Sequence, residues 1–284
     1  MSLDLISPRT FVKPPRASAF LFIFLLLIAC KKNDYQVTPA FYHWQTHFEL
    51  SPEEQSLLDS LQVEKLYVKF FDVDWDFQQQ EALPLAQVRF RQDSIPYQII
   101  PTVFITNRTL EHLSVEAPDT LAARIYKQIK KLSNKVTLEE VQIDCDWTQS
   151  TKNKYFRLLK ALRKQVPDST QLQATIRLHQ VKYARQTGVP PVDRGMLMFY
   201  NVGDVEDWYT ENSILDLETA RQYLQNFQRY PLPLDMALPL FSWGVLFRQG
   251  KMINLISQLE PEELADTGRF EKIGAHRYEV IESN

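Results

Sequence analysis

Two aspartates separated by one residue are the strongest candidates for chemistry in this sequence. Residues 141–148 read Val-Gln-Ile-Asp-Cys-Asp-Trp-Thr, a composition typical of a strand. Strand side chains alternate between faces, so Asp144 and Asp146 would share one face about 7 Å apart. Neighbouring carboxyl groups raise one another's pKa, which keeps one of them protonated for general acid catalysis. We predict Asp144 and Asp146 as catalytic residues; the alternative is a structural pair held by Arg177 or by backbone donors.

Further polar and aromatic residues follow the other predicted strands or lie in them. The predicted substrate-binding residues are His43, Trp44, Gln45, Asp72, Asp74, Trp147, Arg177, His179, Tyr200, Asn201, Asp235 and Trp243. Aromatic rings stack on the apolar faces of sugars, whereas carboxylates, amides and guanidinium groups hydrogen-bond the hydroxyls. This mixture predicts a carbohydrate cleft. Asp72, Asp74 and Asp76 are interpreted as a second carboxylate group, as calcium ligands or as a solvated loop.

The histidines and cysteines give no support for a zinc site, and no cofactor is predicted. His43 and His179 have no second histidine or cysteine at ligand spacing, so we predict no zinc site. No glycine-rich phosphate loop follows the first strand, so a nucleotide-binding sheet is disfavoured. Cys145 lies in an apolar strand pattern and is predicted to be a small buried hydrophobic residue.

Strand-like and helix-like segments alternate along the chain. Predicted strands span residues 40–48, 63–73, 98–106, 140–147, 172–180, 195–201 and 234–243, and predicted helices span 52–61, 81–91, 120–132, 151–166, 179–186 and 217–227. Such alternation is typical of a parallel sheet covered by helices. We predict an α/β fold, a (β/α)8-type barrel resembling the TIM barrel, with functional residues at the carboxyl ends of the strands.

An eighth strand is hard to find. The only candidates after Trp243 are residues 245–248 and 277–281. An open barrel would expose unpaired backbone groups at its edge. Either one of these segments closes the barrel imperfectly, or the chain is a truncated version of a longer one.

The first thirty residues differ in kind from the rest. Three basic residues precede an apolar run of eleven residues, 19–29, which is followed by Cys30. This arrangement is typical of a signal peptide, and the run is shorter than the roughly 20 residues of a spanning helix. Residues 27–30, Leu-Ile-Ala-Cys, resemble the bacterial lipobox. The resemblance implies cleavage of residues 1–29 and lipidation of Cys30, followed by a leash over residues 30–38 and a barrel domain over residues 39–284.

The mature chain is expected to be anchored to a membrane of the bacterial cell envelope through lipid on Cys30, on the periplasmic face or at the cell surface. Removal of residues 1–29 leaves 29 basic and 34 acidic residues, a formal charge of −5. This mildly acidic body argues against a nucleic-acid partner. With Cys30 lipidated, only Cys145 remains, so no intrachain disulfide is possible.

The fourth predicted strand carries a resemblance to a known family. Residues 142–148, with Tyr155, Leu158-Leu159 and Thr175-Ile176 after them, resemble the fourth-strand region of glycosidase-like barrels, closest to an uncharacterised family of bacterial exported proteins. Residues 189–203 add to the likeness. Chitinase-type glycoside hydrolases carry Asp-x-Asp-x-Glu at this strand, with the glutamate as the general acid. Asp144 and Asp146 match its aspartates, but Thr148 replaces the glutamate.

Two functions follow from these features. The first is a tethered glycoside hydrolase in which a strand-end aspartate acts as the acid with a partner such as Asp72, Asp74 or Asp235. The second is a non-catalytic glycan-binding or envelope-assembly lipoprotein built on a degenerate barrel. Both expect a carbohydrate ligand, and a role with a protein partner is the alternative. The missing glutamate and the uncertain eighth strand favour the second function.

Overall fold

The computed structural model describes residues 37–281 apart from positions 93, 135, 258 and 260–261. The chain divides into two units after residue 38, and every helix and strand described below lies in the second, residues 39–284. The predicted signal peptide and Cys30 lie outside the described residues, so both remain predictions. Among the residues that are described, no helix has the length and apolar character needed to cross a membrane.

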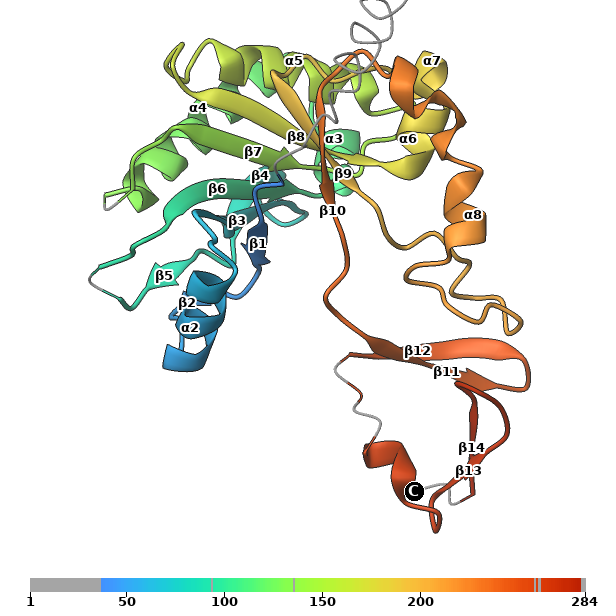
Figure 1. Ribbon diagram of the computed structural model, residues 1–284. Coiled ribbons are helices and arrows are strands. Elements are labelled where there is room, and N and C mark those ends of the chain that lie inside the picture. Colours follow the sequence, from blue (N-terminus) through green and yellow to red (C-terminus); the bar gives the residue numbers. More distant parts are fainter. Residues whose placement is uncertain (1–36, 93, 135, 258, 260–261, 282–284) are drawn as a thin grey trace, which may run out of the picture. The chain divides into compact units, whose positions relative to one another are not determined.

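The main sheet of the described chain has eight strands, of which seven are parallel (Figure 1). In spatial order these are β1 (Ala40–His43), β3 (Lys65–Asp76), β6 (Gln98–Ile105), β7 (Glu140–Asp144), β8 (Gln171–Arg177), β9 (Arg194–Met198) and β10 (Leu234–Ala237). Spatial order follows chain order, and helices connect most of the strands, so the predicted (β/α)-type barrel is confirmed.

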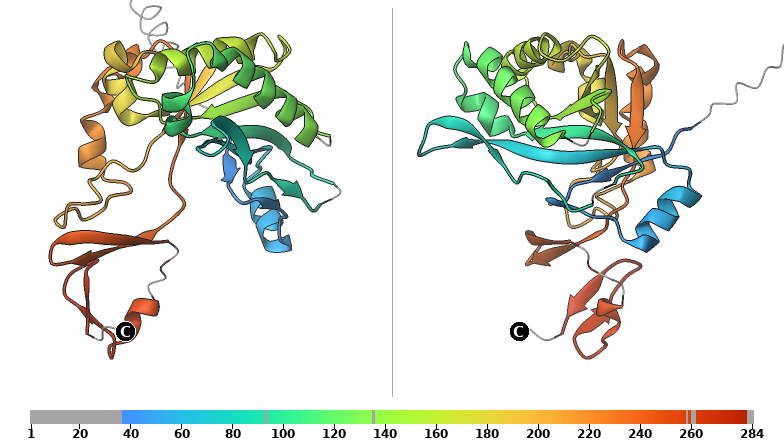
Figure 2. Two further views of the ribbon diagram at one scale, coloured as in Figure 1. Left: turned by 180° about the vertical axis from the view of Figure 1, so that it is seen from behind. Right: turned by 90° about the vertical axis from the view of Figure 1, so that its left-hand side faces the viewer.

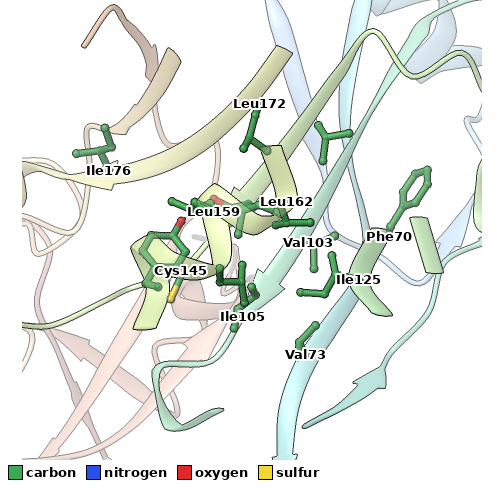
Figure 3. Packing of buried hydrophobic residues seen from close by; sticks show 14 of the residues in the cluster. Phe70, Val73, Val103, Ile105, Ile125, Cys145, Leu159, Leu162, Leu172 and Ile176 are labelled. Carbon is green, nitrogen blue, oxygen red and sulfur yellow. Dashed lines mark hydrogen bonds between the residues drawn. The ribbon is translucent and has the colours of Figure 1, made fainter. Parts of the chain in front are cut away.

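The helices cover the outer face of this sheet. The main helices are α2 (Pro52–Ser60), α4 (Ala117–Leu132) and α5 (Lys152–Arg163), and the later ones are α6 (Leu178–Lys182), α7 (Ala184–Thr187), α8 (Leu217–Arg221) and the 3-10 helix η1 (Leu224–Arg229). Ile125 of α4 and Leu159 and Leu162 of α5 pack against strand residues such as Val103 and Ile176 in one buried cluster (Figure 3). Burial of this apolar surface is the main stabilising contribution to the fold.

The start of α2 shows how local sequence places a helix. The Ser51 side chain accepts a hydrogen bond from the Glu54 backbone N–H, and the Glu54 carboxylate accepts one from the Ser51 N–H. Pro52 occupies the first turn, where its missing N–H has no partner to lose. This capping box confirms the predicted helix start.

The sheet curls but does not close within the described residues (Figure 2). β1 and β10 are the two ends of the strand order, and they do not pair with each other. Both segments considered for an eighth strand form antiparallel hairpins instead: β11 (Trp243–Arg248) pairs with β12 (Lys251–Ser257), and β13 (Phe270–Lys272) pairs with β14 (Tyr278–Val280). The barrel is therefore incomplete in this part of the chain.

Several predicted elements differ from the observed ones. The helix predicted over residues 81–91 is wrong: β4 (Glu81–Leu85) pairs antiparallel with the second half of β3, and a short strand β5 (Arg89–Phe90) pairs with β2 (His47–Phe48). Pro84 disfavours a helix interior, and the long β3 supplies a template for pairing. The predicted strands 40–48 and 234–243 end early, at His43 and Ala237.

Some helices also differ. The helix predicted over 179–186 is split into α6 and α7 at Tyr183, and that over 217–227 ends at Arg221 before η1 begins. A short helix α3 (Asn107–His112), capped by the Thr106 side chain, was not predicted. It follows the carboxyl end of β6.

Candidate functional site

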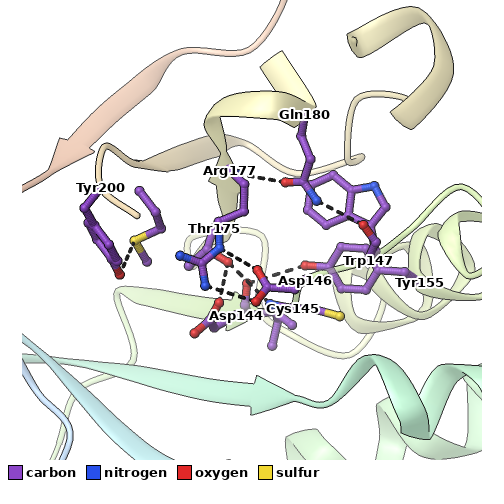
Figure 4. Close-up of polar contacts among 11 residues, drawn as sticks. Asp144, Cys145, Asp146, Trp147, Tyr155, Thr175, Arg177, Gln180 and Tyr200 are labelled. Carbon is purple, nitrogen blue, oxygen red and sulfur yellow. Dashed lines mark hydrogen bonds and ion pairs between the residues drawn. The ribbon is translucent and has the colours of Figure 1, made fainter. Parts of the chain in front are cut away.

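Asp144 is a buried carboxyl group at the end of β7 (Figure 4). Only 5% of the surface of Asp144 is exposed, and the Thr175 hydroxyl donates a hydrogen bond to Asp144 Oδ1 over 2.6 Å. Burial raises the pKa of Asp144 to about 6; the Thr175 hydrogen bond and the Arg177 charge lower it, whereas the charges of Asp146 and Asp72 raise it. Asp144 is therefore a carboxyl group that carries a proton in mildly acidic conditions.

Asp146 lies just beyond the strand and is bound by Arg177 at the end of β8. Arg177 Nε is 2.5 Å from Asp146 Oδ1, and Nη2 is 3.1 Å from Oδ2, which makes the pair bidentate. The Asp146 side chain is 52% exposed, in contrast to the buried Asp144. The two aspartates thus have different environments, one desolvated and one in a charge-assisted pair.

Tyr200 completes this group from the segment after β9. The Arg177 guanidinium carbon lies 5.7 Å from the centre of the Tyr200 ring, a cation–π distance. Asp146, Arg177 and Tyr200 thus come from the carboxyl ends of three consecutive strands (Figure 4). We call these three residues the edge triad. Parallel strands bring their carboxyl ends to one edge of a sheet, which is why residues so far apart in the sequence meet here.

Asp72 lies in the same row of the sheet as Asp144. In the register of the parallel pairs, Asp72 is opposite Phe104, and Phe104 is opposite Asp144. Lys69 Nζ is 3.1 Å from Asp72 Oδ2, whereas the buried Oδ1 has no hydrogen-bond donor within the described residues. Asp72 is thus separated from Asp144 by the width of one intervening strand.

The remaining predicted acids are not part of this group. Asp74 is bound by Arg108 and by the Thr106 hydroxyl, 2.7 Å from Oδ1, and so ties β3 to the start of α3. Asp76 accepts hydrogen bonds from the backbone of the turn that follows β3. Asp235 is paired with Arg194, the first residue of β9, over 2.8 Å. In the register of the parallel strands, Asp235 is opposite Met196 and Met196 is opposite Thr175. Two strands, β8 and β9, therefore lie between Asp235 and Asp144.

The predicted aromatic residues divide into exposed and buried ones. Trp147 is 1% exposed, stacks on Tyr155, and donates its indole N–H to the Thr187 carbonyl. Trp147 was predicted to bind substrate, but its ring belongs to the core and is not on the candidate ligand surface. Trp44 is 39% exposed and stacks on Tyr42. Trp243 is the first residue of the β11–β12 hairpin, and its indole N–H donates a hydrogen bond to the Ser213 hydroxyl.

The other predicted residues lie around the edge of the sheet. His43 Nε2 is 2.9 Å from the His47 carbonyl, and Gln45, His179 and Asn201 are exposed. Thr175, Lys69 and Tyr42 were missed. Thr175 lies two residues before Arg177, and Tyr42 two before Trp44, so strand alternation was a signal for both. Among the described residues, no three histidine, cysteine, aspartate or glutamate side chains are grouped so as to hold a metal ion.

Comparisons with known proteins give only distant likenesses. No family model and no curated protein matches the sequence. The spore cortex-lytic enzyme SleL of Bacillus cereus is 16% identical with a TM-score of 0.46, and the alignment covers 78% of this chain and 56% of that one. The chitinase domain of the spore coat protein CotE from Clostridium difficile is 12% identical with a TM-score of 0.48, covering 86% and 75%. The GH18 chitinase ChiB of Flavobacterium johnsoniae is 13% identical with a TM-score of 0.46, covering 77% and 72%.

The buried Asp144 gives a pH-dependent stability that can be measured. Its folded pKa, about 6, lies above its ordinary value of 3.8, so between these values the folded protein holds a proton that the unfolded chain releases. The contribution of Asp144 therefore makes the unfolding free energy fall as the pH rises through this range. Relative to the wild type, Asp144→Asn should gain about 2–3 kcal/mol between pH 4 and pH 7 in urea denaturation. A difference that stays constant across this range would contradict the burial of an ionisable carboxyl group here.

Proposed function

We propose that this protein binds carbohydrate at the carboxyl edge of its open barrel. The observation that carries the proposal is the edge triad, in which a fixed carboxylate, a guanidinium group and a phenol ring lie together at the strand ends. Sugar hydroxyls are both donors and acceptors. The half-exposed Asp146 carboxylate offers acceptors, and Arg177 retains N–H donors beyond those used in the pair.

Binding is better supported than cleavage. Arg177 binds both carboxylate oxygens of Asp146, so this group is already engaged in an ion pair. Thr148, which replaces the glutamate of the chitinase-type motif, has its hydroxyl 2.8 Å from that of Ser150 and 3.3 Å from that of Thr151. A threonine hydroxyl does not protonate a leaving group. The geometry therefore fits a barrel that holds a glycan without cutting it.

The Arg177→Met variant tests the binding proposal. Loss of a charged hydrogen-bonding group should raise the Kd for the bound glycan by about 10-fold or more. The measurement is titration calorimetry of the full chain in mild detergent with chitin oligosaccharides, muropeptides, cello-oligosaccharides and mannan oligosaccharides. Arg157→Met is the matched control, because Arg157 forms a similar surface pair with Asp119 on the helices. The proposal fails if no probe binds the wild type, or if the two variants weaken binding equally.

Hydrolysis is the second candidate, and it rests on Asp144 and Asp72. Asp144 has a pKa of about 6, which is suitable for a general acid. Asp72 lies two strands away in the same row, where backbones are about 10 Å apart, and this spacing allows the carboxyl separations of glycosidases. If the protein is a hydrolase, the site must open when substrate binds, because Asp144 is buried.

Release of reducing ends from the same oligosaccharides distinguishes the two candidates. If the chain is a hydrolase, Asp144→Asn should lower turnover at least about 100-fold, because general acid catalysis contributes 10²–10⁴-fold. Activity should also decline as the pH rises above 6, where the Asp144 proton is lost. Asp119→Asn, on the helical surface, serves as the control. Turnover that persists in Asp144→Asn would remove this aspartate from any catalytic role.

We also propose that the protein is a lipoprotein of the bacterial cell envelope. The support is the basic segment, the apolar run of eleven residues and the lipobox-like residues 27–30. In a bacterial host fed labelled palmitate, the wild-type chain should incorporate the label, and Cys30→Ala should not. Cys145→Ala is the control, since this second cysteine is buried in the barrel. Equal labelling of Cys30→Ala and the wild type would exclude this anchor.

A further inference from the structure

Three aromatic rings, those of Tyr67, Tyr42 and Trp44, form a stack that ends at the carboxyl end of β1. Tyr67 of β3 is 1% exposed, and Tyr42 of β1 stacks on it with ring centres 4.9 Å apart. Trp44, just beyond β1, also stacks on Tyr42, with ring centres 5.4 Å apart and an angle of 6° between the ring planes. Exposure rises from the first ring to the last, and Trp44 reaches 39%. The stack therefore presents a single half-exposed indole at the carboxyl edge.

Buried amide groups hold the two inner rings in place. Gln142 Oε1 accepts a hydrogen bond from the Tyr42 hydroxyl over 2.8 Å and one from Thr102 over 3.4 Å. Its amide nitrogen donates to Gln173 Oε1, which also accepts from the Tyr67 hydroxyl, both over 3.3 Å. Gln142 and Gln173 are 0% and 1% exposed. These residues form a connected network in which each tyrosine hydroxyl has a partner.

The network extends to a charged pair at the opposite end of the strands. Gln173 Nε2 donates to Glu140 Oε2 over 2.7 Å, and Lys65 Nζ is 3.1 Å from Glu140 Oε1. Buried polar groups that are fully partnered restrict side chains to one arrangement, because any other leaves a donor or acceptor without a partner. Tyr42 is thus fixed both by ring stacking and by its hydroxyl.

Tyr42 also lies close to the candidate site. Burial raises its pKa well above the ordinary value, and the charges of Tyr67, Asp144 and Tyr200 add to the effect. Tyr42 therefore remains a neutral hydrogen-bond donor at ordinary pH. Tyr42 and Tyr200 both pack against one buried cluster, so the curl of the sheet brings β1 toward the strands that carry the edge triad. The cluster consists of Tyr67, Ile100, Met196 and Met198.

We propose that Trp44 is the aromatic platform for the apolar face of a sugar ring, and that Gln142 is a positioning residue that orients this platform through Tyr42. The inference rests on the proposed carbohydrate binding and specifies the ligand further: a pyranose with a continuous C–H face. A flat indole face suits such a ring, whereas the edge triad suits its hydroxyls. A loosely held indole would lose more side-chain freedom on binding, so a fixed one binds more tightly.

A double-mutant cycle tests the coupling. Trp44→Ala should raise the Kd for the oligosaccharide bound by the wild type about 10-fold, and Tyr42→Phe should raise it about 3-fold to 10-fold. In the Trp44→Ala background, Tyr42→Phe should change the Kd by less than 2-fold, because its effect acts through the indole. Gln142→Met should behave as Tyr42→Phe does. Tyr97→Phe is the matched control, since that hydroxyl donates to Asp59 outside the barrel.

A second readout needs no ligand. In protein labelled with 5-fluorotryptophan, the Trp44 resonance, assigned by its loss in Trp44→Ala, should shift or broaden in Tyr42→Phe and remain unchanged in Tyr97→Phe. The positioning role is overturned if the Trp44 resonance is unchanged in Tyr42→Phe, or if Tyr42→Phe weakens binding equally with and without Trp44. If the wild type binds none of the oligosaccharides, the proposed function and the platform both fail, while the fluorine spectrum still decides whether Tyr42 positions Trp44. If Gln142→Met does not fold, Tyr42→Phe alone decides.

Discussion

The desolvation of polar side chains on the inner face of the sheet is the constraint on which the rest of this structure depends. Gln142, Asp144 and Gln173 have almost no exposed surface, yet each bears groups that are costly to bury without partners. Adjacent strands supply Thr175 for Asp144 and Thr102 for Gln142. Strands that are not adjacent supply Tyr42 for Gln142 and Tyr67 for Gln173. The positions of these strands are therefore fixed by hydrogen bonds inside the barrel as well as by apolar packing outside it.

The same constraint separates the two central aspartates. Asp144 points into the sheet interior, where burial dominates and its proton is retained to about pH 6. Asp146 is only two residues further on, but it lies past the end of β7, where half of its side chain is exposed and Arg177 can reach it. Side chains of identical chemistry thus have different properties within one short segment. This division places a fixed ion pair at the surface and a protonatable group beneath it.

The incomplete barrel leaves the inner face of the sheet without a closing strand between β1 and β10 in the described residues. Within the described residues, β1 and β10 remain open edges, and the chain after β10 forms hairpins instead of a further parallel strand. Trp44 and Tyr200 flank the inner face from opposite sides of the strand order, following β1 and β9. Under the proposed function, Trp44 on one side would contact the apolar face of a sugar ring, and the edge triad on the other would contact its hydroxyl groups.

Sequence alone determined most of the alternation of strands and helices and the start of α2 at Pro52, because these depend on local periodicity and helix-start residues. It did not reveal the β3–β4 hairpin. Residues 81–85 form a strand because they pair with β3, and this pairing is not apparent from their own sequence. Tertiary structure decided that Trp147 is core, that Trp44 is exposed, and that Asp235 is paired with Arg194. Burial and ion pairing depend on which distant strands become neighbours, and no short segment of sequence contains that information.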